Sequence, residues 1–206
     1  HPQDVNERLK RIFDVSSIEW ISISPLTKNY LNEFVGQIIV SDEVWYPPEF
    51  KPIDMAQLGT RERHLRMQAK DPGFVRHSRD HWTKWPSSVA QCRKMYMGDD
   101  SINFTILGGA QNISRKLVEL PETWTVHAYD SASVESLLSR GDIYLNFNNE
   151  VYIEEFGRNV MEALSHGLPV IAEPVFAETF GNAVLIPDDS GPPALVDRLR
   201  SDADFF

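Results

Sequence analysis

The alternation of short apolar runs with helical stretches constrains this chain more than any other feature. From Phe74 onward, runs rich in β-branched and aromatic residues are each followed by a segment with helical spacing. This alternation is typical of an α/β fold, in which helices link parallel strands. Because the strands are mostly apolar on both sides, we expect a Rossmann-like parallel sheet with helices on both faces.

The expected elements can be assigned along the chain. The predicted strands are Glu19–Ser24, Gln37–Val40, Phe74–Val75, Ile102–Leu107, Trp124–Tyr129, Asp142–Phe147, Pro169–Ala172 and Ala183–Ile186. The predicted helices are Pro25–Phe34, Arg61–Lys70, Pro86–Tyr96, Ser114–Leu120, Ser133–Ser139, Gly157–His166 and Pro192–Arg200. Gly108-Gly109 should end one strand, and Gly167 should end a helix in the left-handed conformation. The segment Tyr46–Pro52 is proline-rich and is the best candidate for a linker, which divides the chain into 1–50 and 51–206.

Composition and charge exclude several classes of protein. The formal net charge of −10 disfavours nucleic-acid binding, and the single cysteine, Cys92, excludes a disulfide framework and fits a reducing compartment. No apolar run is long enough to span a bilayer, and the start at His1 shows no secretion leader and suggests a fragment. Between Arg61 and Lys94, however, nine Lys and Arg residues stand against three acidic ones. This excess indicates either a solvated basic helix or a local site for a small anion.

One candidate site is the segment Arg76–Trp85, which follows a predicted strand. Arg76, Arg79 and Lys84 could converge on one anion, because guanidinium groups match phosphate oxygens and a lysine adds a point charge. The alternative is a loop of solvated cations with Trp82 and Trp85 packed beneath it. His77 and His81 lie in the same segment and are expected at the surface.

The second candidate site is the junction from Asn148 into the helix that starts at Gly157. Gly157 would leave the first amides of that helix open to an anion. Glu154 and Glu162 would accept hydrogen bonds from hydroxyl groups, such as those of a sugar and a ribose. The alternatives are that Glu154 stabilises the helix dipole and that Glu162 is an exposed helix residue.

Two motifs resemble those of a known family. The string Glu154-Glu155-Phe156-Gly157, with Glu162-Ala163 and Gly167-Leu168-Pro169 after it, resembles the E-x7-E segment of the retaining, nucleotide-sugar-dependent glycosyltransferases of family 4. These enzymes have the GT-B fold of two Rossmann-like domains, and Arg76–Lys84 is similar to their diphosphate-binding loop. The resemblance implies catalytic roles for Glu154, Arg79 and Lys84, and donor-binding roles for Arg76, Phe156, Gly157, Arg158, Glu162 and Tyr129.

The resemblance also implies an activity. Residues 1–50 would be the end of an acceptor-side domain plus the hinge, and residues 51–206 the donor-binding domain. The protein would move a sugar from a UDP- or GDP-linked donor to a glycan, lipid-linked or small-molecule acceptor, with retention and without a metal or cofactor. We expect no nucleic-acid partner and a cytoplasmic location, with peripheral association at the inner membrane face left open. The alternatives are a non-catalytic nucleotide-sugar-binding module and an epimerase of the same architecture.

Overall fold

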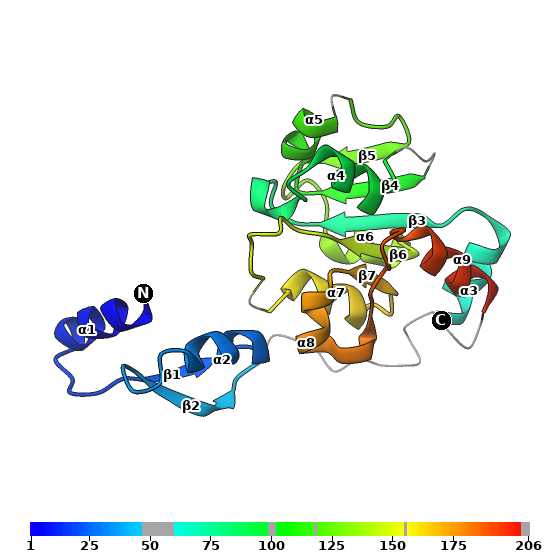
Figure 1. Ribbon diagram of the computed structural model, residues 1–206. Helices are drawn as coiled ribbons and strands as arrows, with labels where there is room; N and C mark the ends of the chain where they lie inside the picture. Colours follow the sequence, from blue (N-terminus) through cyan, green and yellow to red (C-terminus); the bar gives the residue numbers. More distant parts are fainter. Residues whose placement is uncertain (47–59, 99–101, 118, 155, 203–206) are drawn as a thin grey trace. The chain divides into compact units, whose positions relative to one another are not determined.

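A computed structural model describes residues 1–46, 60–98, 102–117, 119–154 and 156–202 of the chain. The chain divides into two compact units, each of which is described here by itself (Figure 1). Unit 1 comprises His1–Pro52 and Glu154–Phe156, and unit 2 comprises Ile53–Ile153 and Gly157–Phe206. The linker expected at Tyr46–Pro52 lies outside the described residues from position 47 onward.

Unit 1 pairs two parallel strands with two helices. Its elements are α1 (Pro2–Phe13), β1 (Glu19–Ser22), α2 (Pro25–Asn32) and β2 (Ile39–Val44). Helix α2 begins where the sequence predicts, because the Ser24 hydroxyl accepts the Thr27 N–H at 3.1 Å. The second strand was predicted two residues too early, since the amides of Gln37 and Ile38 both donate to the Phe34 carbonyl and form a turn. Helix α1 was not predicted, although Val5, Leu9, Ile12 and Phe13 recur along it at helical spacing.

Unit 2 is built on a six-stranded sheet with the order β5-β4-β3-β6-β7-β8. Every neighbouring pair in this sheet is parallel, and each predicted strand of the series is present. The strands are β3 (Gly73–His77), β4 (Asn103–Leu107), β5 (Trp124–His127), β6 (Ile143–Asn146), β7 (Val170–Ala172) and β8 (Val184–Leu185). The expected Rossmann-like α/β fold is therefore confirmed.

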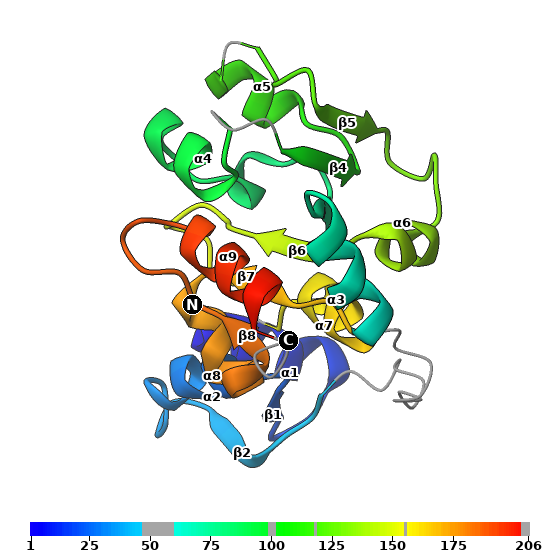
Figure 2. The ribbon, with the colours of Figure 1, turned by 90° about the vertical axis from the view of Figure 1, so that its right-hand side faces the viewer.

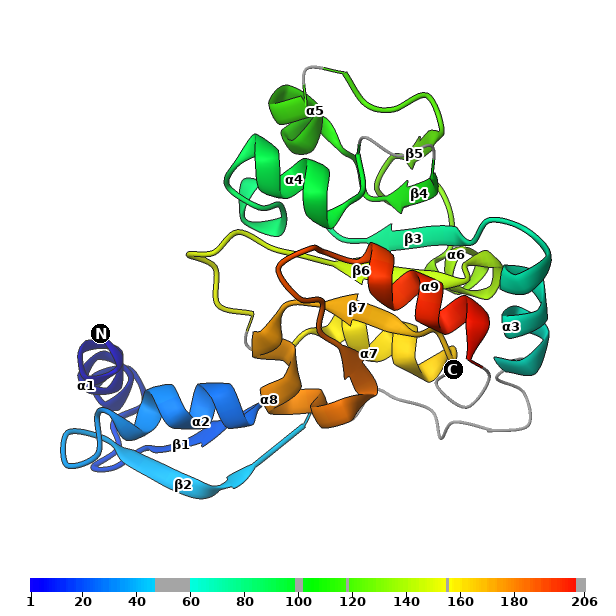
Figure 3. The ribbon, with the colours of Figure 1, turned by 45° about the vertical axis from the view of Figure 1, so that its right-hand side comes forward.

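Helices cover both faces of this sheet, as Figures 2 and 3 show for α9 on one face and α6 and α7 on the other. The α-helices of unit 2 are α3 (Thr60–Ala69), α4 (Val89–Met95), α5 (Gln111–Leu117), α6 (Val134–Arg140), α7 (Arg158–Ser165), α8 (Ala177–Phe180) and α9 (Pro193–Ser201). Three short 3-10 helices accompany them: η2 (Trp82–Lys84), η3 (Pro174–Phe176) and η4 (Gly181–Ala183). The hydrophobic pattern of the sequence does not reveal these 3-10 helices or α8, because each is only about one turn long.

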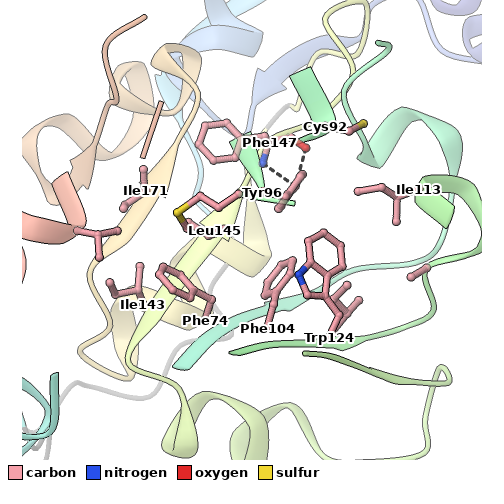
Figure 4. Close-up of a cluster of buried hydrophobic side chains, with 14 of the residues drawn as sticks. Phe74, Cys92, Tyr96, Phe104, Ile113, Trp124, Ile143, Leu145, Phe147 and Ile171 are labelled. Atoms are coloured by element: carbon pink, nitrogen blue, oxygen red, sulfur yellow. Dashed lines mark hydrogen bonds between the residues drawn. The ribbon is translucent and has the colours of Figure 1, made fainter. Parts of the chain in front are cut away.

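An aromatic cluster fills the face of the sheet beneath α4 and α5 (Figure 4). Tyr96 stands at its centre, with its ring stacked on Phe104 at 5.7 Å between centroids and Trp124 packed edge-on against Phe104. The Tyr96 hydroxyl donates to the Phe147 carbonyl at 2.7 Å and accepts the Phe147 N–H at 2.9 Å. These two hydrogen bonds fix the backbone just beyond the carboxyl end of β6.

The glycines predicted to end elements do so. Gly108 and Gly109 end β4 with φ angles of +113° and +96°, which only glycine adopts without strain. Gly167, at φ +66°, ends α7 in a Schellman motif, in which the Leu168 N–H donates to the Ala163 carbonyl at 3.1 Å.

The Asp142 carboxylate joins Arg66 in α3 to the backbone of Gly73, the first residue of β3. It is almost fully buried; its Oδ1 accepts from Arg66 Nη2 at 2.8 Å, and its Oδ2 accepts the Gly73 N–H at 2.9 Å. We expect Asp142→Asn to lower the free energy of unfolding by about 2 kcal/mol, because it removes the charge that faces Arg66. Urea denaturation measures this change. The control Asp71→Asn alters an exposed carboxylate 3.4 Å from Arg200, and equal losses in both variants would contradict the account.

Candidate functional site

The strand order of unit 2 creates a switch point between β3 and β6. From β3 the chain adds β4 and β5 on one side of the sheet and then returns to add β6 on the other side. In open parallel sheets, ligands bind outside the carboxyl ends of the strands at such a point. The segments that follow these two strands are Ser78–Trp85, here called the basic loop, and Phe147–Ile153, here called the β6 loop. The two junctions selected from the sequence therefore follow neighbouring strands.

The last two side chains of β3 lie on opposite faces of the sheet. Arg76 contacts Tyr96, next to α4, and His77 contacts Glu162 in α7. This arrangement follows from the pleat of a strand, in which successive side chains alternate between faces. The sequence predicts a loop after Val75 that contains both residues, whereas β3 continues through His77.

Arg76, in β3, does not join the cations of the basic loop. Its side chain is fully buried, and its guanidinium donates to the Tyr96 hydroxyl and to the Lys84 carbonyl while lying 4.0 Å from the centre of the Trp85 ring. Among the described residues, no carboxylate pairs with it. The expectation that Arg76 converges with Arg79 and Lys84 on one anion therefore conflicts with the geometry. Arg76 instead holds the end of the basic loop in place.

Asp80 anchors the start of the basic loop to α5. Its Oδ2 accepts the Gln111 N–H at 2.6 Å, and its Oδ1 accepts the Asn112 N–H at 3.2 Å and the indole Nε1–H of Trp85 at 3.1 Å. This distant cap explains why α5 begins at Gln111 rather than near Ser114, as predicted. Of the two tryptophans expected beneath the loop, Trp85 is buried and Trp82 is exposed.

The two predicted cations within the basic loop differ in exposure, since Arg79 is exposed and Lys84 is half-buried. Arg79 is exposed, and its guanidinium makes no hydrogen bond or ion pair with the described part of the chain. The Lys84 ammonium lies 3.1 Å from the Tyr152 hydroxyl and 4.2 Å from the centre of the Tyr152 ring. The Asn149 N–H donates to the Thr83 carbonyl at 2.9 Å, so the basic loop and the β6 loop are in direct contact. No sequence signal marked Tyr152.

Helix α7 begins without a side-chain cap. Gly157 stands at its N-cap with φ +78°, and a Cβ atom there would lie 2.5 Å from the Phe176 ring. Glycine is therefore required on both conformational and steric grounds. The first amides of an α-helix have no partner within the helix and favour an anion. Arg158, at the first helical position, is exposed.

Glu162 joins α7 to the end of β3. Its Oε2 lies 2.6 Å from His77 Nε2, and its Oε1 lies 3.4 Å from Arg158 Nε. The hydrogen bond from His77 is the main cause that lowers the pKa of the Glu162 carboxyl below its ordinary value, so the carboxylate stays ionised near neutral pH. His77 is only 8% exposed, and the expectation that it lies at the surface is wrong. His81 is exposed, as expected.

The contacts described above do not include three of the predicted residues. Glu154 and Phe156 belong to unit 1, where the Phe156 ring lies 6.1 Å from that of Tyr46. Tyr129 follows the edge strand β5 and is 64% exposed. The roles that the resemblance implies for Glu154, Phe156 and Tyr129 stay predictions.

A family model decides the relationship of this chain to known proteins. Residues 86–201, more than half of the chain, match the model described as glycosyl transferases group 1. The chain belongs to the group 1 glycosyltransferases. The matched region of this glycosyltransferase chain runs from the end of the basic loop to the end of α9 and so includes α7 and Glu162. No curated protein matches the chain.

Solved structures share the fold of this glycosyltransferase chain. TarM is 13% identical over 96% of this chain and 38% of its own, with a TM-score of 0.57. Anabaena Alr3699/HepE, in complex with UDP and glucose, is 16% identical over 93% of this chain and 55% of its own, with a TM-score of 0.53. WaaG, described as a glycosyltransferase involved in lipopolysaccharide biosynthesis, is 14% identical over 87% of this chain and 51% of its own, with a TM-score of 0.51. The chain thus spans about half or less of each of these proteins.

None of the helices in the described ranges combines the length and apolar character needed to cross a membrane. Within the same ranges, no three His, Cys, Asp or Glu side chains gather closely enough to hold a metal ion.

Proposed function

We propose that unit 2 binds the nucleoside diphosphate of a sugar donor, and that the protein transfers the sugar from this donor to an acceptor. The observation that carries the proposal is the contact between the basic loop and the β6 loop at the switch point, where α7 also contacts β3 and β6. Cations such as those of the basic loop, and the first amides of a helix such as α7, are groups that bind phosphate oxygens.

Each group in the site has a distinct role in this proposal. Arg79, Lys84 and the first amides of α7 bind the diphosphate, and Glu162 accepts hydrogen bonds from the ribose hydroxyls. Glu154 accepts hydrogen bonds from the hydroxyls of the donor sugar. Arg76 supports the basic loop from within the core and does not touch the donor.

The reaction breaks the bond between the anomeric carbon of the sugar and an oxygen of the β-phosphate, and it forms a bond from that carbon to a hydroxyl oxygen of the acceptor, whose proton passes to the departing diphosphate. Negative charge develops on the departing diphosphate while the sugar ring becomes positively charged. Lys84, Arg79 and the α7 amides stabilise the departing charge because they are already directed at it before the bond breaks. In this proposal transfer proceeds with retention and without a metal ion, as in the family 4 enzymes, to a glycan, lipid-linked or small-molecule acceptor at the cytoplasmic side.

Calorimetric titration of the chain with UDP, GDP and ADP tests the binding step. We expect at least one of these nucleotides to bind with an affinity that EDTA leaves unchanged, because protein cations rather than a divalent ion would neutralise the diphosphate. No binding of any of the three would overturn the proposal. Binding that strictly requires added manganese would overturn its metal-independent form.

A second candidate function is a nucleotide-sugar-binding module without turnover. The groups that carry the binding step, which are Arg79, Lys84 and the first amides of α7, would bind a diphosphate whether or not the sugar is transferred. Incubation with the nucleotide sugar whose nucleotide binds best separates the two. Release of free nucleoside diphosphate supports the transferase, and binding without release supports the module.

A further inference from the structure

We propose that His77 is a positioning residue that holds the Glu162 carboxylate as the acceptor for the ribose hydroxyls of the bound nucleotide. The inference rests on the proposed function and extends it to a residue outside the two motifs. It starts from the 2.6 Å contact between His77 Nε2 and Glu162 Oε2. A carboxylate can only accept, so Nε2 carries the proton and donates it.

Tyr144 fixes the His77 ring from the side away from Glu162. The Tyr144 hydroxyl accepts a hydrogen bond from the backbone N–H of His77 at 3.2 Å and donates one to the backbone carbonyl of His77 at 3.0 Å. The same hydroxyl lies 3.3 Å from the ring atom Nδ1 of His77. The two rings also pack edge to face, with 5.5 Å between their centres. Burial raises the pKa of Tyr144 to about 12, so its hydroxyl keeps its proton and can serve as a donor at neutral pH.

Asn159 ties this pair back to the start of α7. Its side-chain Nδ2 donates to the Tyr144 hydroxyl at 3.1 Å and to Asn146 Oδ1 at 2.9 Å. The contacts therefore run from Asn159 in α7 through Tyr144 in β6 and His77 in β3 to Glu162, so both ends of the series lie on α7. Such a network leaves the His77 ring little freedom to turn away from the carboxylate.

The consequence for Glu162 is a fixed orientation in the ionised form. Its side chain is 29% exposed, so part of the carboxylate faces outward while His77 binds Oε2 from within. An ionised carboxylate accepts several hydrogen bonds and donates none. It therefore favours a ligand with free hydroxyls and disfavours one that lacks them, because the carboxylate would then be desolvated without a partner. His77 thus supports selection of a ribonucleotide with its 2′ and 3′ hydroxyls.

Two variants separate positioning from packing. His77→Leu removes the donor, and His77→Gln keeps an N–H donor near the position of Nε2. Each is titrated with whichever of UDP, GDP and ADP binds the wild-type chain best, and with the 2′,3′-dideoxy form of that nucleotide. We expect His77→Leu to weaken the binding of the ribonucleotide about tenfold and to change the binding of the dideoxy form little. His77→Gln should bind the ribonucleotide with an affinity within about threefold of the wild-type value.

The ionisation of Glu162 gives a second readout that does not need a ligand. Carbon NMR of the Glu162 carboxyl should show its pKa raised in His77→Leu, because the main hydrogen bond that lowers it is lost, and less so in His77→Gln. If His77→Leu weakened the binding of the ribonucleotide and of its dideoxy form equally, or left the pKa of Glu162 unchanged, the proposed role of His77 would be overturned. Failure of the wild-type chain to bind any of the three nucleotides would instead overturn the proposed function itself.

Discussion

Replacing Lys84 by alanine is expected to weaken the binding of nucleoside diphosphates by about 30- to 100-fold. The Lys84 ammonium lies 3.1 Å from the Tyr152 hydroxyl, where the basic loop meets the β6 loop. A phosphate oxygen bound there would accept a charge-assisted hydrogen bond from this ammonium, worth about 2–3 kcal/mol. Isothermal titration calorimetry with UDP, GDP and ADP measures the change, which should be similar for all three because the diphosphate is common to them.

Lys70→Ala is the matched control for this prediction. It removes the same charge from an exposed lysine that precedes β3, at the opposite end of that strand from the basic loop. We expect it to alter affinity by less than about twofold, since exposed charges at this distance are screened by salt. Equal losses in Lys84→Ala and Lys70→Ala would mean that binding depends on net charge and not on the basic loop.

Replacing Arg76 by alanine is expected to lower the free energy of unfolding by about 3–5 kcal/mol. The change leaves a cavity between Trp85 and Tyr96 and removes the donor that serves the Lys84 carbonyl. Urea denaturation measures the loss. Affinity for the diphosphate should fall as well, because the backbone that carries Lys84 loses its support.

Arg79→Ala is the counterpart that distinguishes a core arginine from a ligand-binding one. Because Arg79 is exposed, its removal should leave the free energy of unfolding within about 0.5 kcal/mol of the wild-type value. The same change should weaken the binding of the diphosphate about tenfold. An Arg76→Ala variant that keeps its stability and loses only affinity would contradict the assignment and return Arg76 to the donor site.

The strands could be predicted from the sequence, because apolar runs of strand length and the glycines that end them are local signals. Gly167 illustrates this: its position after an amphipathic segment predicted the end of α7, and the structure has it there. Contacts between distant residues left no such signal. The start of α5 depends on Asp80, which lies 31 residues before Gln111 in the sequence.

The face on which a side chain lies decided what could be predicted of the site. The sequence places Arg76, Arg79 and Lys84 in one segment, but continuation of β3 by two residues turns Arg76 into the core and His77 toward α7. Such a boundary is set by pairing with β4, which extends to His77 opposite Leu107. The pairing of His77 with Glu162, 85 residues apart, follows only once the strand order is known.

The most direct test of the account is a crystal structure of the chain with the nucleoside diphosphate that binds it best. The account predicts that the two phosphates lie between Lys84 and the first amides of α7, with the ribose hydroxyls on Glu162. Phosphates bound at the amino ends of the strands, or on the face of the sheet away from α7, would contradict it.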